Sequence, residues 1–295
     1  MTLNKTMTID EIVDQFSDGM TIGLGGWATR RKPMALVRAI ARSSLKDLTI
    51  VALGGGPDVG LLAATGKIKK LVFSFVSMDQ IPLEPHFRAA RQAAAFEVFE
   101  LDEGLVHWGL RAAAMKLPFL PSRIGIGTDL VKQAELSKTV TSPFADGETF
   151  VAMPALKLDV ALLHVHRSDI RGNVLTLSPD PLFDELFARA ADRTFVTAEK
   201  IVPTAELDMR ANSRFNLVER PMITGVAQAP FGAHPTSAAP DYQLDMGHLK
   251  TYVEGAASPE AWADYRARFV DVDDAGYLAA IGGADAVKSI PQPAY

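Results

Sequence analysis

The 295-residue chain contains no cysteine. Disulfides, zinc–thiolate sites, iron–sulfur clusters and thiol nucleophiles are therefore excluded. A cysteine-free chain is compatible with the cytoplasm, where we expect the protein to reside.

The chain also lacks a basic stripe and a long apolar run. It carries 30 Lys and Arg against 35 Asp and Glu, and the one tight basic cluster is Arg30, Arg31 and Lys32. This distribution argues against nucleic acid as a partner. No apolar run approaches the roughly 20 residues that span a bilayer, and the polar N-terminal residues do not resemble a secretory signal. We expect neither a membrane nor a nucleic acid as partner.

Hydrophobic residues make up 48% of the chain and charged residues 22%, the balance of a globular protein with a large core. Short apolar runs alternate with amphipathic segments through the first 200 residues. This alternation predicts an α/β fold built of βαβ units around a mostly parallel sheet. Runs that are apolar on both faces, such as 160–163, predict a sheet covered by helices on both sides. The expected strands are 21–26, 48–53, 71–76, 96–101, 151–153, 160–165 and 194–198.

Helices are expected between these strands. Pro33 opens the first, Asp58 caps a short helix to about Ala64, and Asp102 caps a helix over 103–115. The segment 117–121 (LPFLP) ends that helix. After about residue 200 the pattern loosens, and proline and glycine accumulate over 221–240. No long linker separates domains, so we expect one domain over 1–295 with an elaborated C-terminal third. The remaining expected helices are an N-terminal one, 86–95, 181–191 and one around Trp262, Tyr265 and Phe269.

Three glycine-rich turns, 23–26, 54–56 and 125–127, are interpreted as turns that follow strands. Ligands bind at the carboxyl ends of parallel strands, and glycine lets backbone N–H groups reach a phosphate or an oxyanion. The alternative is that these turns serve only tight chain reversal. None has the dinucleotide spacing or the Gly-Lys-Ser/Thr of a P-loop, so neither NAD nor ATP is expected.

Several polar residues are candidates for a site, each with a structural alternative. Trp27, Arg30, Arg31 and Lys32 follow the first turn; the cations either grip a substrate carboxylate or a phosphate, or form a solvated cluster. His164 and His166, with Asp159 or Asp169, either bind a metal or serve packing and hydrogen bonding, and we expect no metal. His234 occupies a turn typical of a structural corner. Ser74 and Ser77 lie outside any nucleophile-elbow motif.

An ordered set of segments resembles the α subunits of class I CoA-transferases, in the glutaconate-transferase branch. The segments are 20–27 (MTIGLGGW), 31–33 (RKP), 117–121 (LPFLP), 159–166 (DVALLHVH) and 229–235 (APFGAHP). The resemblance covers about residues 7 to 280. It implies an α/β subunit that pairs with a β subunit of the same fold, as αβ or α2β2, and acts on acyl-CoA with no cofactor beyond coenzyme A. In transferases of this family the nucleophilic glutamate belongs to the β chain. The expected substrate- and CoA-binding residues are Gly25, Gly26, Trp27, Arg30, Arg31, Lys32, Gly54 and Gly55.

A second set of residues resembles the α subunits of the ring-cleaving hydrolases of bacterial steroid catabolism, which belong to the same fold family. It comprises 102–104 (DEG), 109–110 (GL), 112–114 (AAA) and 117–121, together with Trp27, Arg30 and Arg31. In that branch a glutamate of the α chain is implicated in hydrolytic C–C cleavage. The resemblance therefore makes Glu103 the expected catalytic residue.

Glu103 stands at the first turn of the expected helix over 103–115, where a carboxylate also complements the helix dipole. Two features favour catalysis. The helix is apolar around much of its circumference, which predicts burial, and Gly104 is expected to leave open space beside the carboxylate. Burial would raise the pKa of Glu103 and make it a better general base, although the helix N-terminus acts in the opposite direction.

Three functions remain open from the sequence. The first is ring-opening hydrolysis of a cyclic ketone on a CoA-linked steroid catabolite, with Glu103 as the base. The second is CoA transfer between carboxylates, as in glutaconate or 3-oxoacid CoA-transferases. The third, from another class, is a non-catalytic acyl-CoA-binding subunit, because a fold does not fix a function.

Overall fold

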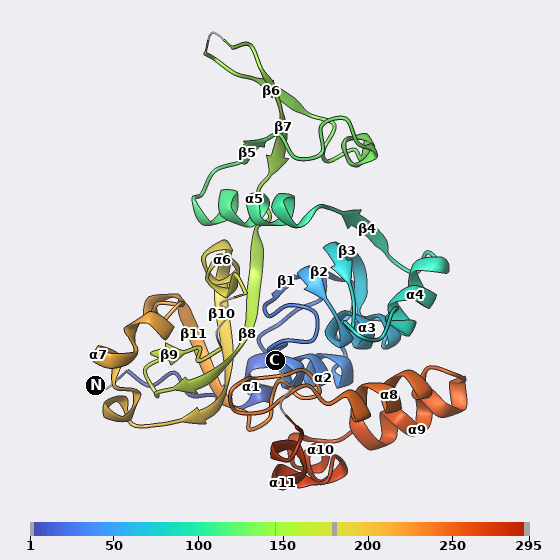
Figure 1. Cartoon of the computed structure of the whole chain (residues 1–295), viewed down its shortest axis with the longest axis vertical. Helices are drawn as coiled ribbons and strands as arrows, with labels where there is room; N and C mark the ends of the chain where they lie inside the picture. The colour runs from blue at the N-terminus through green and yellow to red at the C-terminus, as the bar shows by residue number, and fades with distance from the viewer. Residues whose placement is uncertain (1–2, 145, 179–181, 292–295) are drawn as a thin grey trace.

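The computed structural model describes residues 3–144, 146–178 and 182–291. A central sheet runs in the order β11-β10-β8-β1-β2-β3-β4, and every neighbouring pair in this order is parallel (Figure 1). The short β9 (Val174–Leu175) pairs antiparallel with β8. The expected α/β fold with a mostly parallel sheet is confirmed. The parallel strands are β1 (Thr21–Leu24), β2 (Leu48–Gly55), β3 (Ile68–Val76), β4 (Glu97–Glu100), β8 (Leu158–Ser168), β10 (Ala191–Ile201) and β11 (Ile223–Gln228).

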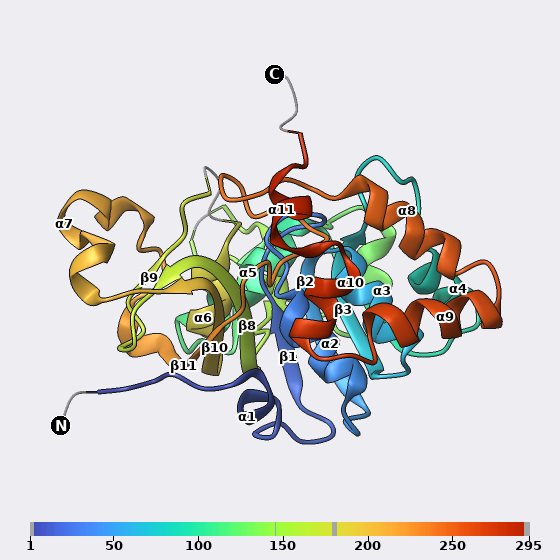
Figure 2. The same ribbon diagram turned by 90° about the horizontal axis from the view of Figure 1, so that it is seen from below.

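Helices cover both faces of the sheet, as the doubly apolar strands predicted. On one face Ile22 and Leu24 pack with α1 (Ile9–Val13), α2 (Met34–Arg42) and α3 (Pro57–Ala64), and on the other Ala161 and Leu163 pack with α5 (Glu103–Ala114) and α6 (Asp184–Ala190). The C-terminal helices α8 (Met246–Gly255) and α9 (Pro259–Phe269) lie on the side of α3 and α4 (Pro85–Gln92), whereas α7 (Met209–Asn212) lies at the opposite end (Figure 2).

Local capping explains where two of these helices begin. Thr8 and Glu11 form a reciprocal capping box at α1. Asp102 caps α5 as predicted, accepting a hydrogen bond from the Gly104 N–H at 2.7 Å. The prediction that Asp58 caps α3 is wrong. The helix begins at Pro57, two residues before the Val59 that an Asp58 cap would require, so Asp58 lies inside the first turn and accepts from the Gly56 N–H at 2.7 Å.

An antiparallel arm projects from the main body between α5 and β8 (Figure 1). It consists of β5 (Phe119–Ser122), β6 (Thr139–Thr141) and β7 (Thr149–Pro154), in the order β5-β7-β6. The sequence predicted only 151–153 as a strand here. The glycine turn 125–127 follows β5, so it does follow a strand, but that strand belongs to the antiparallel arm and not to the parallel sheet.

Other differences are confined to boundaries and one missed strand. The segment 221–240, expected to be irregular, contains β11 at the sheet edge. The helix expected from Pro181 is α6, and Pro181 itself lies outside the described residues. Within the described ranges, no helix is both long and apolar enough to cross a bilayer. The division into one domain over 1–295 with an elaborated C-terminal third stays a prediction. The remaining helices are α10 (Asp274–Ala280) and α11 (Gly283–Lys288).

Candidate functional site

The expected site residues gather at the carboxyl-terminal edge of the sheet. Gly25 to Lys32 follow β1, Gly54 and Gly55 end β2, and Glu103 follows β4 after two intervening residues. Because β1, β2, β3 and β4 are consecutive parallel neighbours, their carboxyl ends lie along one edge. This is the edge at which α/β sheets of this kind bind ligands.

The backbone N–H groups of the first glycine turn are already used inside the protein. The Gly25 N–H donates to the Leu162 carbonyl at 2.9 Å and the Gly26 N–H donates to Asp184 Oδ1 at 3.0 Å. The Ala28 N–H donates to the Gly54 carbonyl at 2.9 Å. A Cβ on Gly25 would stand 2.5 Å from a Leu163 methyl carbon and 2.8 Å from Asp184 Oδ1. This geometry supports close packing for Gly25 and Gly26, the alternative that the sequence left open.

The basic cluster does not form one surface. Arg31 and Lys32 are buried, with 1% and 0% of their surface exposed, and only Arg30 faces solvent. Arg31 Nη1 lies 2.7 Å from Asp184 Oδ2, and Lys32 Nζ lies 2.9 Å from Asp58 Oδ2. The alternative of a solvated cluster is therefore wrong for Arg31 and Lys32. Their placement also does not support a grip on substrate, since each already has an internal carboxylate.

Trp27 and Arg30 form the exposed part of this segment. The Arg30 guanidinium stands 5.1 Å from the centre of the half-buried Trp27 ring, which packs edge-on against Phe75 at 5.3 Å. Gly54 makes room for this ring, because a Cβ at residue 54 would stand 2.8 Å from Trp27 Cδ1. Trp27 and Arg30 are thus the two members of the expected binding set that a ligand can reach directly.

Glu103 is the first residue of α5 and is exposed. The predicted burial of this carboxylate is therefore wrong for the chain on its own, although Leu105 and Val106 just after it are fully buried. The open space expected beside Gly104 is also absent, because a Cβ there would stand 2.5 Å from Ile124 Cδ1. Across the described ranges, no side chain or backbone group hydrogen-bonds or pairs with the Glu103 carboxylate.

Exposed apolar side chains lie close to Glu103. Ile124, packed on Gly104, is 37% exposed, and Ile126 is 50% exposed. One helical turn after Glu103, the His107 ring lies 3.9 Å from the ring of Phe183, which is 40% exposed. Apolar surface of this kind beside an unpaired carboxylate marks an interaction or binding surface.

The two strand histidines both have protein partners. His164 Nδ1 lies 2.8 Å from Thr197 Oγ1, and His164 Nε2 lies 2.8 Å from Glu199 Oε1. His166 accepts from the Leu177 N–H at 3.0 Å and donates to the Ala239 carbonyl at 2.8 Å. This pattern supports the packing and hydrogen-bonding role. In the described part of the chain, no group of three or more His, Asp or Glu side chains is arranged to hold a metal ion.

The other candidate residues, His234, Ser74 and Ser77, make contacts typical of a structural role. His234 is buried and has a partner at each ring nitrogen. Its Nε2 lies 3.0 Å from Asp245 Oδ2, and its Nδ1 lies 2.8 Å from the Tyr277 hydroxyl. Ser74 donates to the Leu53 carbonyl, and the Ser77 hydroxyl accepts from the Asp79 N–H at 3.0 Å. None of these contacts forms a nucleophile–base pair.

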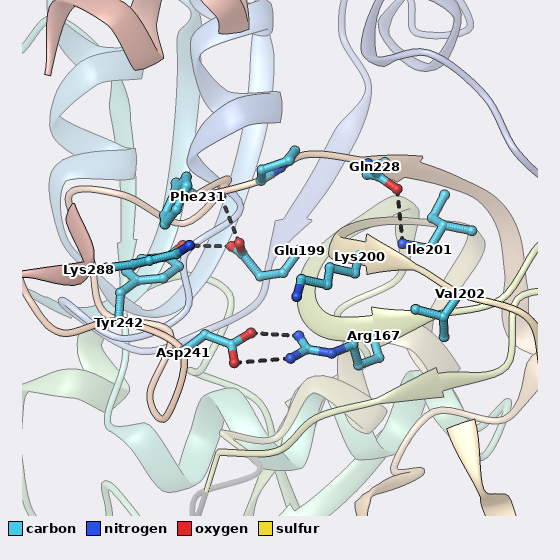
Figure 3. Close-up of a pocket in the computed structure, with 11 residues that line it drawn as sticks. Arg167, Glu199, Lys200, Ile201, Val202, Gln228, Phe231, Asp241, Tyr242 and Lys288 are labelled. Atoms are coloured by element: carbon cyan, nitrogen blue, oxygen red, sulfur yellow. Dashed lines mark hydrogen bonds and ion pairs between the residues drawn. The ribbon is translucent and has the colours of Figure 1, made fainter. Parts of the chain in front are cut away.

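A cavity of about 520 Å³ opens at the carboxyl ends of β8, β10 and β11 (Figure 3). Sequence reasoning missed it, although β8 and β10 were predicted. Its residues come from β8, β10, β11, the 229–242 loop and α11, which lie far apart in sequence. The apolar segment around 194–198 indicated a strand, but nothing in the sequence showed that Glu199 and Tyr242 meet.

The sequence is similar to known proteins over most of its length. A family model described as coenzyme A transferase matches residues 6–214. The IpdA subunit of the cholesterol ring-cleaving hydrolase of Rhodococcus jostii is 44% identical over 284 residues, covering 94% of this chain and 96% of the relative. One of the subunits of glutaconate CoA-transferase from Acidaminococcus fermentans is 30% identical over 267 residues, covering 85% of this chain and 82% of the relative.

A solved structure agrees with these relatives. The crystal structure of glutaconate coenzyme A-transferase from Acidaminococcus fermentans superposes with a TM-score of 0.89 at 27% identity, covering 96% of this chain and 94% of that chain. The similarity thus extends through the C-terminal helices beyond residue 214.

Proposed function

The chain belongs to the coenzyme A transferase family, and from this premise we propose that it is the α-type subunit of a heteromeric enzyme that opens a ring by hydrolysis. The substrate class is a cyclic ketone on a coenzyme A-linked steroid fragment. The higher identity to the ring-cleaving subunit, 44% against 30% for the glutaconate transferase subunit, supports hydrolysis over CoA transfer.

The observation that carries the proposal is the position of Glu103. Its carboxylate is exposed, has no partner in the described ranges and stands at the sheet edge where this fold class binds ligands. A carboxylate with no internal partner is free to accept a proton from water. An internally paired one, such as Asp58 or Asp184, is not.

The chemistry needs only water and a base. Glu103 takes a proton from water as the oxygen bonds to the ring carbonyl carbon. The tetrahedral adduct collapses to a carboxylic acid, and the C–C bond to the neighbouring ring carbon breaks. The electron pair stays on that carbon as a carbanion conjugated to a second carbonyl, and a proton returns to it. The reaction adds one water, involves no redox change and uses no group beyond coenzyme A.

A β-type subunit is part of the proposal. The relative from Rhodococcus and the glutaconate transferase chain are both named as subunits of larger enzymes. Here the surface around Glu103 is open and apolar, with Ile124, Ile126 and Phe183 exposed. A partner that covers this surface would exclude bulk water from around Glu103 and from the reacting atoms. Whether the complex is αβ or α2β2, and whether it is cytoplasmic, stay predictions.

The two reactions differ in the molecule that reacts with the thioester substrate: hydrolysis uses water, whereas CoA transfer needs a free carboxylate. The purified αβ complex is incubated with the steroid-derived CoA thioester in buffer without any free carboxylate. Hydrolysis predicts a ring-opened product that gains one water and keeps its thioester. CoA transfer predicts turnover only after a carboxylate such as acetate is added, with a new thioester formed. Binding of the thioester without turnover in either condition would support the non-catalytic alternative.

A further inference from the structure

We propose that the cavity at the carboxyl ends of β8, β10 and β11 is a second binding site, and that it takes a small phosphate monoester. At about 520 Å³ it falls within the size range of small-molecule sites. It is separate from the surface around Glu103, because β10 and β4 are five strand intervals apart, on the order of 24 Å at the usual strand spacing.

The carboxylates of the cavity already have donors. Glu199 Oε1 accepts from the Tyr242 hydroxyl at 2.8 Å and lies 2.8 Å from His164 Nε2, and Glu199 Oε2 accepts from the Phe231 N–H at 2.7 Å. Burial alone would raise the pKa of Glu199, but these hydrogen bonds, first that with His164, bring it below its usual value. Glu199 is therefore an ionised carboxylate at the base of the cavity, and both of its oxygens are hydrogen-bonded to the protein.

The second carboxylate is neutralised in the same way. Arg167 holds Asp241 with two contacts, Nη1 to Oδ2 at 2.6 Å and Nη2 to Oδ1 at 3.2 Å, and Figure 3 shows the two side chains facing each other. This bidentate pair occupies both oxygens of Asp241 and both terminal nitrogens of the guanidinium. The pair cancels the charge of both groups and occupies this side of the guanidinium, whose Nη1 also donates to the His166 carbonyl at 2.7 Å.

The free donors are cationic. Lys200 on β10 and Lys288 at the end of α11 line the cavity, and their amines have no partner in the described ranges. Figure 3 shows the Lys200 amine pointing into the space between Glu199 and the Arg167–Asp241 pair. Gln228 accepts from the Ile201 N–H at 3.1 Å through its oxygen, which leaves its NH₂ group as a third donor. An anion is the ligand that this set of donors fits.

The type of donor selects among anions. A planar carboxylate is best recognised by a guanidinium fork, and the one fork here is already occupied by Asp241. Ammonium groups act as point charges, and two of them suit a dianionic phosphate. The rest of the lining, including Ile201, Val202 and Pro230, is apolar and can hold the organic part. Such a phosphate monoester is either a free metabolite or the 3′-phosphate end of a coenzyme A thioester.

Calorimetric titration of the full chain, in its αβ complex, tests the site. The probes are glucose 6-phosphate, adenosine 3′,5′-bisphosphate and succinate. The double variant Lys200→Met/Lys288→Met keeps the apolar stems and removes both charges, and Lys250→Met, an exposed lysine on α8 outside the cavity, is the matched control. Melting temperature of each variant verifies the fold. We expect a phosphate ester to bind the wild type and Lys250→Met alike, and at least about tenfold more weakly to the double variant.

The probes also separate the two sources. Binding of both phosphate esters identifies a free metabolite as the ligand. Binding of the bisphosphate alone, together with a higher KM for the thioester in the double variant, identifies coenzyme A as the ligand. The proposal is overturned if neither ester binds saturably, if the double variant binds them as well as the wild type does, or if succinate binds more tightly than either. Saturable binding of the esters is measured without turnover, so the existence of the site is tested independently of whether Glu103 is catalytic. Only the assignment of the ligand to coenzyme A uses KM.

Discussion

Lys32 and Asp58 form an ion pair that is fully buried, with Nζ and Oδ2 2.9 Å apart and neither side chain exposed. Removing one member of such a pair leaves the other charged and uncompensated in the interior. We therefore expect Lys32→Met to lower the free energy of unfolding by about 3–5 kcal/mol. The double variant Lys32→Met/Asp58→Asn, which leaves no charge and keeps an acceptor for the Gly56 N–H, should recover much of that loss.

Urea denaturation of the complex measures both variants, and Arg30→Met, the exposed member of the same cluster, is the control. If Lys32 binds substrate instead, Lys32→Met raises KM and leaves stability near wild type. The same experiment with Arg30→Met is expected to give the reverse pattern, an effect on substrate binding with little change in stability.

Glu103→Gln is expected to keep the fold and thioester binding and to lower turnover by about 10²–10⁴-fold, because glutamine cannot take a proton from water. If the carboxylate only complements the helix dipole, the variant loses about 0.3–1 kcal/mol of stability with turnover intact. Glu260→Gln is the matched control, since Glu260 is also an exposed first-turn glutamate, on α9. Single-turnover rate and melting temperature are measured on the same preparation.

The chain on its own is expected to be poorly soluble or inactive, because half of the site and its apolar cover would be missing. Ile126→Asp, at an exposed arm residue two positions after the Ile124 that packs on Gly104, should weaken binding of the β-type subunit at least about tenfold, which corresponds to about 1.4 kcal/mol. Ile170→Asp, at an exposed isoleucine after β8, is the control and should leave assembly unchanged. Size-exclusion chromatography and titration of the two chains decide this; an active, monodisperse chain alone contradicts the prediction.

His86 should make part of the stability depend on pH. Burial lowers its pKa to about 4 from the usual 6.5. Between pH 6.5 and pH 4 the unfolded chain therefore binds a proton that the folded chain does not, and stability falls as the pH falls through this window. His86→Phe should reduce this fall, since Nε2 has no partner in the described ranges and the ring packs on Trp262 with centroids 4.2 Å apart.

Unfolding curves at pH 7 and pH 4.5 compare the wild type with His86→Phe and His166→Phe. The second variant loses the hydrogen bonds to Ala239 and Leu177, so it should be less stable at both pH values. An unchanged difference between the two pH values in His86→Phe would show that His86 does not contribute to the acid sensitivity.

Activity is expected to survive exhaustive chelation. The proposed chemistry uses a carboxylate and water, and the ring nitrogens of His164 and His166 are bonded to protein groups. Turnover is measured before and after dialysis against EDTA. Loss of activity that zinc or manganese restores would contradict the prediction.

The parallel sheet could be predicted because its strands are apolar on both faces and alternate with clear helices. The arm could not, since β5 and β6 are only three or four residues long and are largely exposed, so they have no strong period. β11 was missed because prolines and glycines surround it. For such short or flanked strands, pairing with a distant strand decides the structure, and the sequence does not show that pairing.

The same limit applies to the site. Trp27, Arg30 and Glu103 are where the motifs placed them, at the carboxyl-terminal edge. The burial of Arg31 depends on Asp184, 153 residues away, so its neighbours in the sequence gave no sign of it. Conversely, the apolar helix after Glu103 suggested a buried carboxylate, but α5 buries only the residues that follow. In the proposed complex, the β-type subunit is what covers Glu103.

The Trp27 ring packs so closely on Gly54 that it limits which substitutions residue 54 can accept during evolution. A side chain at residue 54 would collide with the Trp27 ring at 2.8 Å and with Phe75 at 2.7 Å. Any larger residue at position 54 is therefore acceptable only in a background where residues 27 and 75 have already become smaller. The order of changes matters, so the three positions should show strong epistasis: the single replacement of Gly54 is harmful, whereas the same replacement after the rings have been reduced is tolerated.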